Sequence, residues 1–360
     1  MRSGPSAHTR PDSLAVASAH RAGTSGEPGQ GVVLPRAVSS VLRHHESMTW
    51  NADSLPDQTG RVVLVTGANA GLGFWTSLGL ARAGAEVVLA SRSATKTQAA
   101  MRAIRVKVPD ARLSHLPFDT SSLDSVRAAG ERLADLDRLD ALVANAGMVH
   151  MPKERQETAD GIELVFATNV VGHAALLAEA LPVLQRTADA HDSAPRVVLL
   201  GSLSTLLVRF HGDDLQLRDE YSGWQAYAQS KIALSSLGFE LDRRLAASHS
   251  TVRALVAHPG YSVNGLDRRV PGVNEPTRGR RFSDTLQSVY AQSKQRGAEP
   301  TLRAVTDEAA DGGWFYGPRW LTKGDAVRQT PAAITTDRDV ASALWTDLER
   351  LIGTPILPTS

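Results

Sequence analysis

The chain of 360 residues contains no cysteine. It therefore cannot form a disulfide, use a thiol nucleophile, or hold a thiolate zinc site or an iron–sulfur cluster. A redox function would need a bound cofactor. An excess of either charge is also lacking, because 39 Lys and Arg face 38 Asp and Glu, for a net charge of +1. We therefore expect no nucleic acid and no anionic membrane as an electrostatic partner.

Long hydrophobic runs are absent as well. No apolar stretch reaches the roughly 18 to 20 residues that a membrane-spanning helix needs, and the longest are short segments such as residues 62–65. The hydrophobic content of 42% is typical of a globular protein with a sizeable core. These features predict a soluble, cytoplasmic protein without a membrane span.

The first 47 residues differ in composition from the rest. They are rich in Ser, Gly, Pro and Ala and show neither a helical nor a strand period. So few large apolar side chains cannot offset the entropy of ordering, which predicts disorder. A targeting peptide and a mis-assigned start at Met48 are the alternatives. We divide the chain into a disordered extension, residues 1–47, and one domain, residues 48–360.

From residue 61 onward, strand patterns alternate with helical patterns. Residues 61–66, RVVLVT, form the apolar run typical of a strand buried on both faces of a parallel sheet. Further strands are expected at 86–90, 112–118, 139–144, 196–201 and 251–257, and helices at 72–83, 94–107, 122–135, 161–187 and 224–248. This alternation predicts an α/β fold, a single Rossmann-type doubly wound parallel sheet with helices on both faces. Residues 261–281 are expected to form a long surface loop.

A glycine-rich turn follows the first strand directly, where residues 66–73 read TGANAGLG. Glycines at such a turn let the backbone approach a pyrophosphate, and the following helix N-terminus supplies N–H donors. An ordinary tight turn is the alternative, but the strand–turn–helix context favours dinucleotide binding. The cofactor-binding residues predicted here are Thr66, Gly67, Asn69, Gly71, Leu72 and Gly73.

The second and third strand ends bear on the choice of cofactor. Ser91 and Arg92 stand where an acidic residue would bind the free ribose hydroxyls of NAD. A guanidinium can pair with a 2′-phosphate instead, so NADP(H) is favoured over NAD(H), with a solvated loop arginine as the alternative. Asp119 and Thr120 follow the third strand and are predicted to lie beside the adenine, although helix N-capping by residues 119–121 would explain them equally.

The segment YAQSK at 227–231 places Tyr227 and Lys231 four residues apart on one helix face. An ammonium near a phenol favours the phenolate, and moving the tyrosine pKa from about 10 to about 7 takes about 4 kcal/mol. Ser202 ends the fifth strand at the carboxyl edge of the sheet, where ligands bind in this architecture. Its hydroxyl is expected to bond a substrate oxygen, and a plain strand-end turn is the alternative.

Together these motifs resemble the short-chain dehydrogenase/reductase family over about residues 50–350. The matching segments, in chain order, are TGANAGLG at 66–73, NAG at 145–147, TNVVGH around Asn169, VVLLGSLS around Ser202, Tyr227 with Lys231, and HPG at 258–260. More narrowly, DGIELVFATNVVGH, WQAYAQSK and QRGAEPTLRA are similar to the retinol dehydrogenase and protochlorophyllide reductase-like branch, which typically prefers NADP.

The resemblance implies hydride transfer between NADP(H) and a carbonyl or alcohol. Tyr227 would donate or remove the proton, Ser202 would hold the substrate oxygen, and Lys231 would bind the nicotinamide ribose and lower the Tyr227 pKa. Asn169 would help to hold a water in the proton relay. The resemblance also places residues along the cofactor, with the adenosine side lined by Asn145, Ala146 and Gly147 and the nicotinamide bordered by Pro259 and Gly260.

Two departures from the family pattern stand out. After Gly260 the chain reads YSVNGL, without the threonine that often contacts the cofactor's amide or phosphate. Gly201 stands where the first serine of a Ser-Ser pair is common. His173 and His258 are interpreted as packing residues, and without a clustered ligand set we predict no metal site.

Two other functions stay open. One is a carbon–carbon double-bond reductase or an epimerase on the same fold, and the other is a non-catalytic NADP-binding regulator. The substrate is expected to be a small, largely apolar molecule, and a homo-oligomer is compatible with the sequence. The side chains that suggest an apolar pocket are Leu203, Leu206, Leu207, Phe210, Trp224, Tyr261 and Phe282.

Overall fold

The computed structural model describes residues 50–149 and 151–357. The predicted extension at 1–47 lies outside the described residues. Within the described part, eight strands form one sheet and two short strands pair separately. The strands of the main sheet are β1 (Val62–Thr66), β2 (Glu86–Ser91), β3 (Leu113–Pro117), β4 (Ala141–Ala144), β5 (Arg196–Leu200), β6 (Arg253–Ala257), β9 (Phe315–Pro318) and β10 (Ala326–Gln329).

The main sheet has the order β10-β9-β6-β5-β4-β1-β2-β3. Every neighbouring pair is parallel except β9 and β10, which pair antiparallel. β1 pairs with both β2 and β4, so the strand order reverses at this point, where doubly wound sheets bind their ligands. The predicted α/β fold is confirmed, and the structure adds a parallel strand and an antiparallel edge strand beyond β6.

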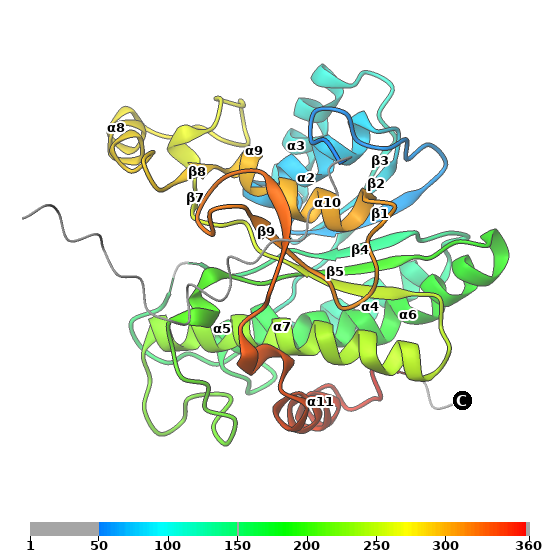
Figure 1. Ribbon diagram of the computed structural model, residues 1–360, viewed down its shortest axis with the longest axis vertical. Helices are drawn as coiled ribbons and strands as arrows, with labels where there is room; N and C mark the ends of the chain where they lie inside the picture. Colours follow the sequence, from blue (N-terminus) through cyan, green and yellow to red (C-terminus); the bar gives the residue numbers. More distant parts are fainter. Residues whose placement is uncertain (1–49, 150, 358–360) are drawn as a thin grey trace, which may run out of the picture. The chain divides into compact units, whose positions relative to one another are not determined.

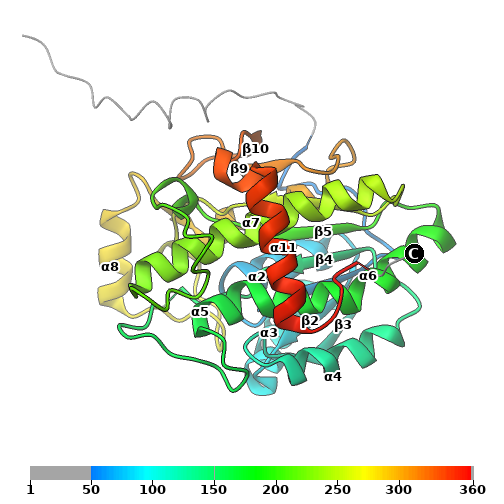
Figure 2. The same ribbon diagram turned by 90° about the horizontal axis from the view of Figure 1, so that it is seen from below.

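Helices cover both faces of the sheet (Figure 1). One face carries α2 (Gly71–Arg82), α3 (Ala94–Lys107) and α10 (Glu299–Thr306), and the other carries α4 (Leu123–Ala134), α6 (Gly172–His191) and α7 (Gly223–Ala247). α11 (Arg338–Ile352) packs outside α7 (Figure 2). Successive strand residues alternate between the two cores: Leu142 packs into one and Val143 into the other, and both are fully buried.

The helix expected at 161–187 is interrupted. A short helix α5 (Leu164–Phe166) leads into a π-helical segment (Ala167–Val171), and α6 follows. The helix begins at 164 because the Glu163 carboxylate accepts hydrogen bonds from the amides of Val165 and Phe166. Leu164–His191 is long and apolar enough to cross a membrane by length and composition, the one such helix in the described part, so the predicted absence of a membrane span is not confirmed. Most of it is buried inside the protein, as expected of a core helix.

The prediction of a surface loop at 261–281 is partly wrong. It contains β7 (Ser262–Val263), a 3₁₀ turn (Asn264–Leu266) and the beginning of α8 (Arg278–Leu286). β7 pairs with β8 (Gln292–Ser293), and α9 (Lys294–Gly297) follows directly. Figures 1 and 2 show α8 and α5 at the same end of the sheet. This region therefore forms a structured layer next to the strand ends.

Candidate active site

Tyr227 and Ser202 meet at the carboxyl edge of the sheet. Tyr227 lies in the second turn of α7, and its hydroxyl donates to Oγ of Ser202, just after β5, at 3.3 Å. The same Oγ accepts from the amide of Ser204 at 3.2 Å, which begins a 3₁₀ turn. With both acceptor positions of Ser202 in use, its own O–H is left to donate. In the ligand-free protein the hydroxyl hydrogen of Ser202 is therefore the one hydrogen of this pair that is not donated within it.

Tyr227 is largely covered by its neighbours. Burial raises the pKa of the Tyr227 phenol above its usual 10, and the bond to Ser202 acts in the opposite direction. The Trp224 ring lies 6.1 Å from the Tyr227 ring, centroid to centroid. In the ligand-free protein the phenol is therefore protonated at neutral pH and is a proton donor.

Lys231 follows Tyr227 by one helical turn and is buried. Its ammonium donates to the carbonyl oxygen of Leu200 at 2.8 Å, at the end of β5. Burial lowers the pKa of Lys231 to about 8, so the side chain is still mostly charged at neutral pH. A Cβ on Gly147 would lie 3.6 Å from Nζ of Lys231 and 3.3 Å from Oδ1 of Asn169, which brings these three residues together.

Asn169 lies in the π-helical segment and is fully buried. Its Oδ1 accepts from the amide of Met148 at 2.7 Å, and its Nδ2 donates to Oγ of Ser230 at 2.9 Å. Met148 follows β4 and Ser230 lies on α7, so Asn169 joins the two elements beside Tyr227. π-Helical turns recur at functional sites because they turn one side chain out of the regular register.

A buried histidine connects this segment to the glycine-rich turn. His173 Nδ1 lies 3.1 Å from the carbonyl oxygen of Asn169, and Nε2 lies 3.0 Å from Oγ1 of Thr66. A carbonyl can only accept, so the network assigns the proton to Nδ1 and makes Nε2 an acceptor. Thr66 Oγ1 also accepts from the amides of Asn145 and Ala146. Thr66 therefore joins the ends of β1 and β4, and His173 links Thr66 to the π-helical segment.

The second buried histidine, His258, holds the turn after β6. Its Nδ1 accepts from the amide of Gly260 at 3.2 Å, so Nε2 carries the proton and donates to Oε1 of Gln329 at 2.8 Å. Gln329 in turn donates to the carbonyl oxygen of Pro318 at 2.7 Å. The sequence did not indicate Gln329, because it lies on an antiparallel strand that was not predicted.

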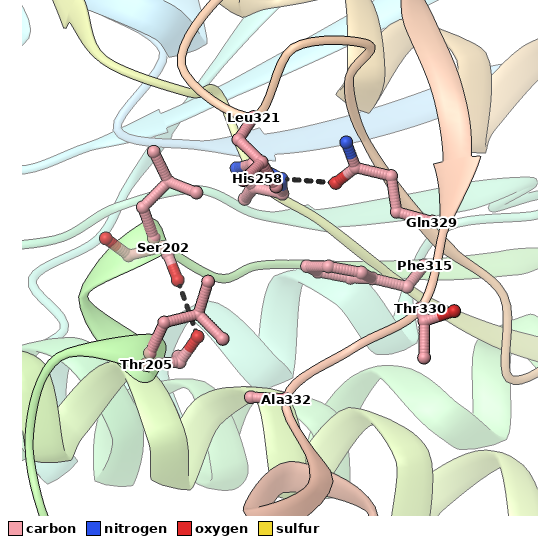
Figure 3. Close-up of a pocket in the computed structure, with 10 residues that line it drawn as sticks. Ser202, Thr205, His258, Phe315, Leu321, Gln329, Thr330 and Ala332 are labelled. Atoms are coloured by element: carbon pink, nitrogen blue, oxygen red, sulfur yellow. Dashed lines mark hydrogen bonds between the residues drawn. The ribbon is translucent and has the colours of Figure 1, made fainter. Parts of the chain in front are cut away.

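His258 and Gln329 line a pocket beside Ser202 (Figure 3). Ser202 and its neighbours after β5 form one wall, and β9 and β10 form the other. The remaining lining residues are Leu203, Thr205, Leu206, Phe315, Leu321, Thr330 and Ala332. Leu203 and Leu206 were among the side chains expected to line an apolar pocket.

These two histidines predict an acid-sensitive fold. Burial lowers the pKa of both His173 and His258 to about 4, whereas an unfolded histidine titrates near 6.5. Between these values the unfolded chain binds more protons, so the free energy of unfolding is expected to fall as the pH is lowered from about 6.5 to about 4. Each histidine contributes up to about 3 kcal/mol.

Denaturant unfolding at pH 4.5, 5.5 and 7 measures this slope. The His173→Gln and His258→Gln variants are expected to be less stable at pH 7 but to lose less stability on acidification. An unchanged slope in the double variant would show that other groups control the acid response.

The glycine-rich turn fits a dinucleotide. Gly67 and Gly71 have positive φ angles of 65° and 57°, and a Cβ on Gly73 would lie 2.5 Å from the carbonyl oxygen of Gly67. No side chain caps the N-terminus of α2, so its first amides are available to an anion. Asn69 and Leu72 are half-buried in the same turn. The backbone of this turn therefore leaves room for a diphosphate and offers it amide donors.

The other predicted cofactor residues lie at neighbouring strand ends. Ser91 is buried and bonds Thr97, while the Arg92 guanidinium is exposed just after β2. Oδ1 of Asp119 accepts from the amide and hydroxyl of Ser121. Ser122, rather than a residue of 119–121, caps α4. Thr120 is buried, and Pro259 and Gly260 form the turn after β6.

The described part of the chain contains no group of His, Asp and Glu side chains that could hold a metal ion. The structure instead gathers the predicted residues along one edge of the sheet. One cluster contains Tyr227, Ser202, Lys231 and Asn169. The glycine-rich turn is connected to this cluster by Thr66, which is linked through His173 to Asn169, and Gly147 lies close to Lys231 and Asn169. Ser91, Arg92 and Asp119 lie at the ends of β2 and β3 and do not contact that cluster in any hydrogen bond found here.

The sequence of this chain is similar to those of known dehydrogenases. The family model for short chain dehydrogenases matches residues 61–270. Retinol dehydrogenase 13 of Homo sapiens is 34% identical over 303 residues, which cover 82% of this chain and 85% of that protein. Polyprenol dehydrogenase of Mus musculus is 35% identical over 318 residues, which cover 88% of this chain and 91% of that protein.

Among solved structures, an uncharacterized protein from Mycobacterium paratuberculosis has a TM-score of 0.69 at 32% identity, covering 86% of this chain and 99% of that one. L-Sorbose reductase from Gluconobacter frateurii, complexed with NADPH and L-sorbose, has a TM-score of 0.57 at 18% identity, covering 76% and 98%. This second likeness shows the fold alone.

Proposed function

Because this chain belongs to the short chain dehydrogenase family and is an oxidoreductase acting on CH–OH or C=O groups, we propose that it uses NADP(H) and the residues Tyr227, Ser202, Lys231 and Asn169. The observation that carries the proposal is the hydrogen bond between Tyr227 and Ser202 at the sheet edge. Lys231 follows Tyr227 by one helical turn, and the nearby glycine-rich segment has room and amide donors for a dinucleotide diphosphate.

The proposed chemistry follows from the two hydroxyl groups. A substrate carbonyl oxygen placed between Tyr227 and Ser202 would accept a hydrogen bond from each. In reduction the Tyr227 phenol gives its proton to that oxygen, and in oxidation the phenolate removes the proton from the alcohol. Hydride donation and acceptance are supplied by the bound nicotinamide. The protein therefore has to position the substrate oxygen and control one proton.

Lys231 and Asn169 act on Tyr227 in this proposal. The Lys231 ammonium would bind the nicotinamide ribose and favour the phenolate, opposing the effect of burial on the Tyr227 pKa. Asn169, fixed by Met148 and Ser230, would help to hold a water that connects the site to solvent. The charge of Lys231 is lost as the pH rises through about 8, so its support for the phenolate weakens above that value.

A largely apolar alcohol or aldehyde is the proposed substrate class. Trp224 packs beside Tyr227 and is 43% exposed, and Leu207, after the Ser202 turn, is 67% exposed. Apolar side chains left open at a reaction site favour an apolar ligand. The relatives named retinol and polyprenol dehydrogenase carry the names of apolar alcohols. The soluble state and the cytoplasmic location stay predictions of the sequence.

The proposal is tested by fluorescence titration of the purified protein with NADPH and NADH, followed by a panel of apolar aldehydes and alcohols. Cofactor binding with turnover of one of these substrates supports it. Cofactor binding without turnover of any carbonyl or alcohol would favour a regulator, and failure to bind either dinucleotide would contradict the proposal.

Arg92 is expected to set the cofactor preference. Its guanidinium is exposed just after β2, where the proposal puts the 2′-phosphate, and charged hydrogen bonds contribute about 1.5 to 3 kcal/mol each. Arg92→Gln should therefore weaken NADPH binding about 10- to 100-fold and leave NADH binding within about twofold. Equal losses for both cofactors would mean that Arg92 does not contact the 2′-phosphate.

A further inference from the structure

A lysine from outside the predicted cofactor site covers the glycine-rich turn. Lys294 is the first residue of α9, and a Cβ built on Gly71 would lie 3.2 Å from its Nζ and 3.6 Å from its Cδ. Gly71 is the first residue of α2, the helix whose N-terminus faces the cofactor diphosphate in this fold. Packing between α2 and α9 holds the lysine in this place.

The Lys294 ammonium has no hydrogen bond or ion pair with any residue of the described part. The acid that attracts it most strongly is Asp267, whose Oδ1 accepts from the amide of Gln295. Asp284 also attracts it, but this carboxylate already pairs with Arg280, whose own charge repels the ammonium. Burial lowers the pKa of Lys294, which shows that the charged form is not well compensated.

A purely structural lysine would be unusual in this environment. A partly buried ammonium without a hydrogen-bonded partner costs stability that the more distant Asp267 and Asp284 offset only in part. A ligand with negative charge removes that cost. The position of the ammonium over Gly71 identifies the place where such a ligand would have to lie.

We propose that Lys294 binds the diphosphate of the dinucleotide cofactor at the N-terminus of α2. The α2 turn offers backbone amides and a helix dipole but no side-chain cation of its own, and no acidic residue occupies its first turn. Lys294 supplies a full positive charge from a different segment. This inference rests on the proposed function, because it requires a bound dinucleotide.

The segment that carries Lys294 also supports the nicotinamide side. Gln292, two residues earlier on β8, donates its side-chain amide to the carbonyl oxygen of Pro259 at 2.9 Å. Pairing of β7 with β8 fixes the same segment to the residues after Gly260. A diphosphate bound by Lys294 would therefore be joined through a few residues to the turn beside the reacting ring.

The test is a fluorescence titration of NADPH and NADH with three variants. Lys294→Met removes the charge at similar length, Lys294→Arg keeps it, and Lys107→Met is a control that removes an exposed lysine at the end of α3. Since both cofactors share the diphosphate, Lys294→Met is expected to raise both Kd values by the same factor, about 10- to 100-fold. Lys294→Arg should stay within about fivefold of the wild type, and Lys107→Met within about twofold.

The outcomes separate this inference from the proposed function. If the wild type binds NADPH and Lys294→Met binds both cofactors equally well, the inference is wrong and the proposed function stands. A loss for NADPH alone would place Lys294 at the 2′-phosphate and would also overturn it. If the wild type binds neither cofactor, both the inference and the proposed function are wrong.

Thermal unfolding of the ligand-free protein gives a readout independent of the cofactor. Lys294→Met is expected to unfold at about the same temperature as the wild type, because removing the burial cost of the ammonium is opposed by the loss of its attraction to Asp267 and Asp284. A clearly lower unfolding temperature, with normal affinity in the folded fraction, would make Lys294 a structural residue and contradict the proposal.

Discussion

Replacing Tyr227 by phenylalanine is expected to lower kcat about 10²- to 10⁴-fold, the range that a general acid or base contributes. The substitution removes one oxygen, which donates to Ser202 and would give the proton to the substrate. The ring and its contact with Trp224 are kept, so the fold and cofactor affinity should change little. Steady-state rates and NADPH titrations on the same preparations measure the two effects separately.

Tyr221→Phe is the matched control for this experiment. Tyr221 lies just before α7 and its hydroxyl is 3.4 Å from Oε1 of Glu163, so the change removes a phenol close by. Burial and the nearby Glu163 carboxylate raise the pKa of Tyr221 to about 12, which makes it a poor proton donor at neutral pH. We expect kcat of Tyr221→Phe within about threefold of the wild type. Equal rates for Tyr227→Phe and the wild type would remove Tyr227 from the proposed chemistry.

Alanine at Gly172 is expected to lower the free energy of unfolding by about 3 kcal/mol, at the upper end of typical overpacking costs. A Cβ at this position would lie 2.0 Å from the backbone carbonyl oxygen of Thr120. Gly172 is the first residue of α6, and α6 makes extensive contact with α4, which begins three residues after Thr120. To remove this clash, α6 would have to move away from the loop that follows β3, because a backbone carbonyl cannot change its position as a flexible side chain can.

Gly130→Ala on α4 provides the comparison. The three atoms nearest to its Cβ would all belong to the side chain of Glu179, which can move, and alanine in a helix is favoured over glycine by about 1 kcal/mol. We expect this variant to be as stable as the wild type or slightly more stable in denaturant unfolding. If both glycine variants behaved alike, the close approach of α6 to Thr120 would not limit stability.

The first part of the fold follows closely from sequence patterns. The strand expected at 61–66 is observed as Val62–Thr66, and the helix expected at 224–248 as Gly223–Ala247. Strands buried on both faces are continuous apolar runs, and the helices between them are long enough to show a period. Both signals are local, and the sheet order follows from the general preference for right-handed crossovers.

The remainder depends on contacts that no local pattern encodes. β7 and β8 have two residues each, and β9 and β10 have four, so none contains enough positions for a reliable period. Their pairing partners come from distant parts of the chain, as β6 with β9 shows. Residues 261–281 have the composition of a loop, and tertiary packing rather than composition folds part of them.

The candidate site shows the same division. Tyr227 and Ser202 could be placed together because both belong to elements with clear patterns that end at one sheet edge. The bond between Lys231 and the Leu200 carbonyl could not be foreseen, since it depends on how deeply α7 is buried. Gln329 and Lys294 were missed because they lie in segments without a predicted position. A lysine at the start of a four-residue helix gives no sequence signal, because only the folded chain brings it next to Gly71.

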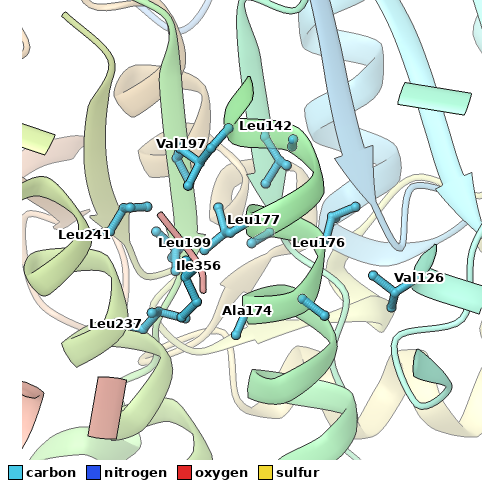
Figure 4. Packing of buried hydrophobic residues seen from close by; sticks show 14 of the residues in the cluster. Val126, Leu142, Ala174, Leu176, Leu177, Val197, Leu199, Leu237, Leu241 and Ile356 are labelled. Atoms are coloured by element: carbon cyan, nitrogen blue, oxygen red, sulfur yellow. The ribbon is translucent and has the colours of Figure 1, made fainter. Parts of the chain in front are cut away.

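The π-helical segment has a consequence for how this protein can change during evolution. Deleting one residue within Ala167–Val171 would restore a regular helix, but it would also rotate α6 by about 100° against α5. Ala174 and Leu177 belong to the buried core, where Leu177 lies beside Leu199 of the sheet, and both would turn away from their present neighbours (Figure 4). Asn169 can therefore be replaced during evolution by a single substitution. Loss of the extra helical residue would require simultaneous substitutions at all the positions of α6 that are now buried.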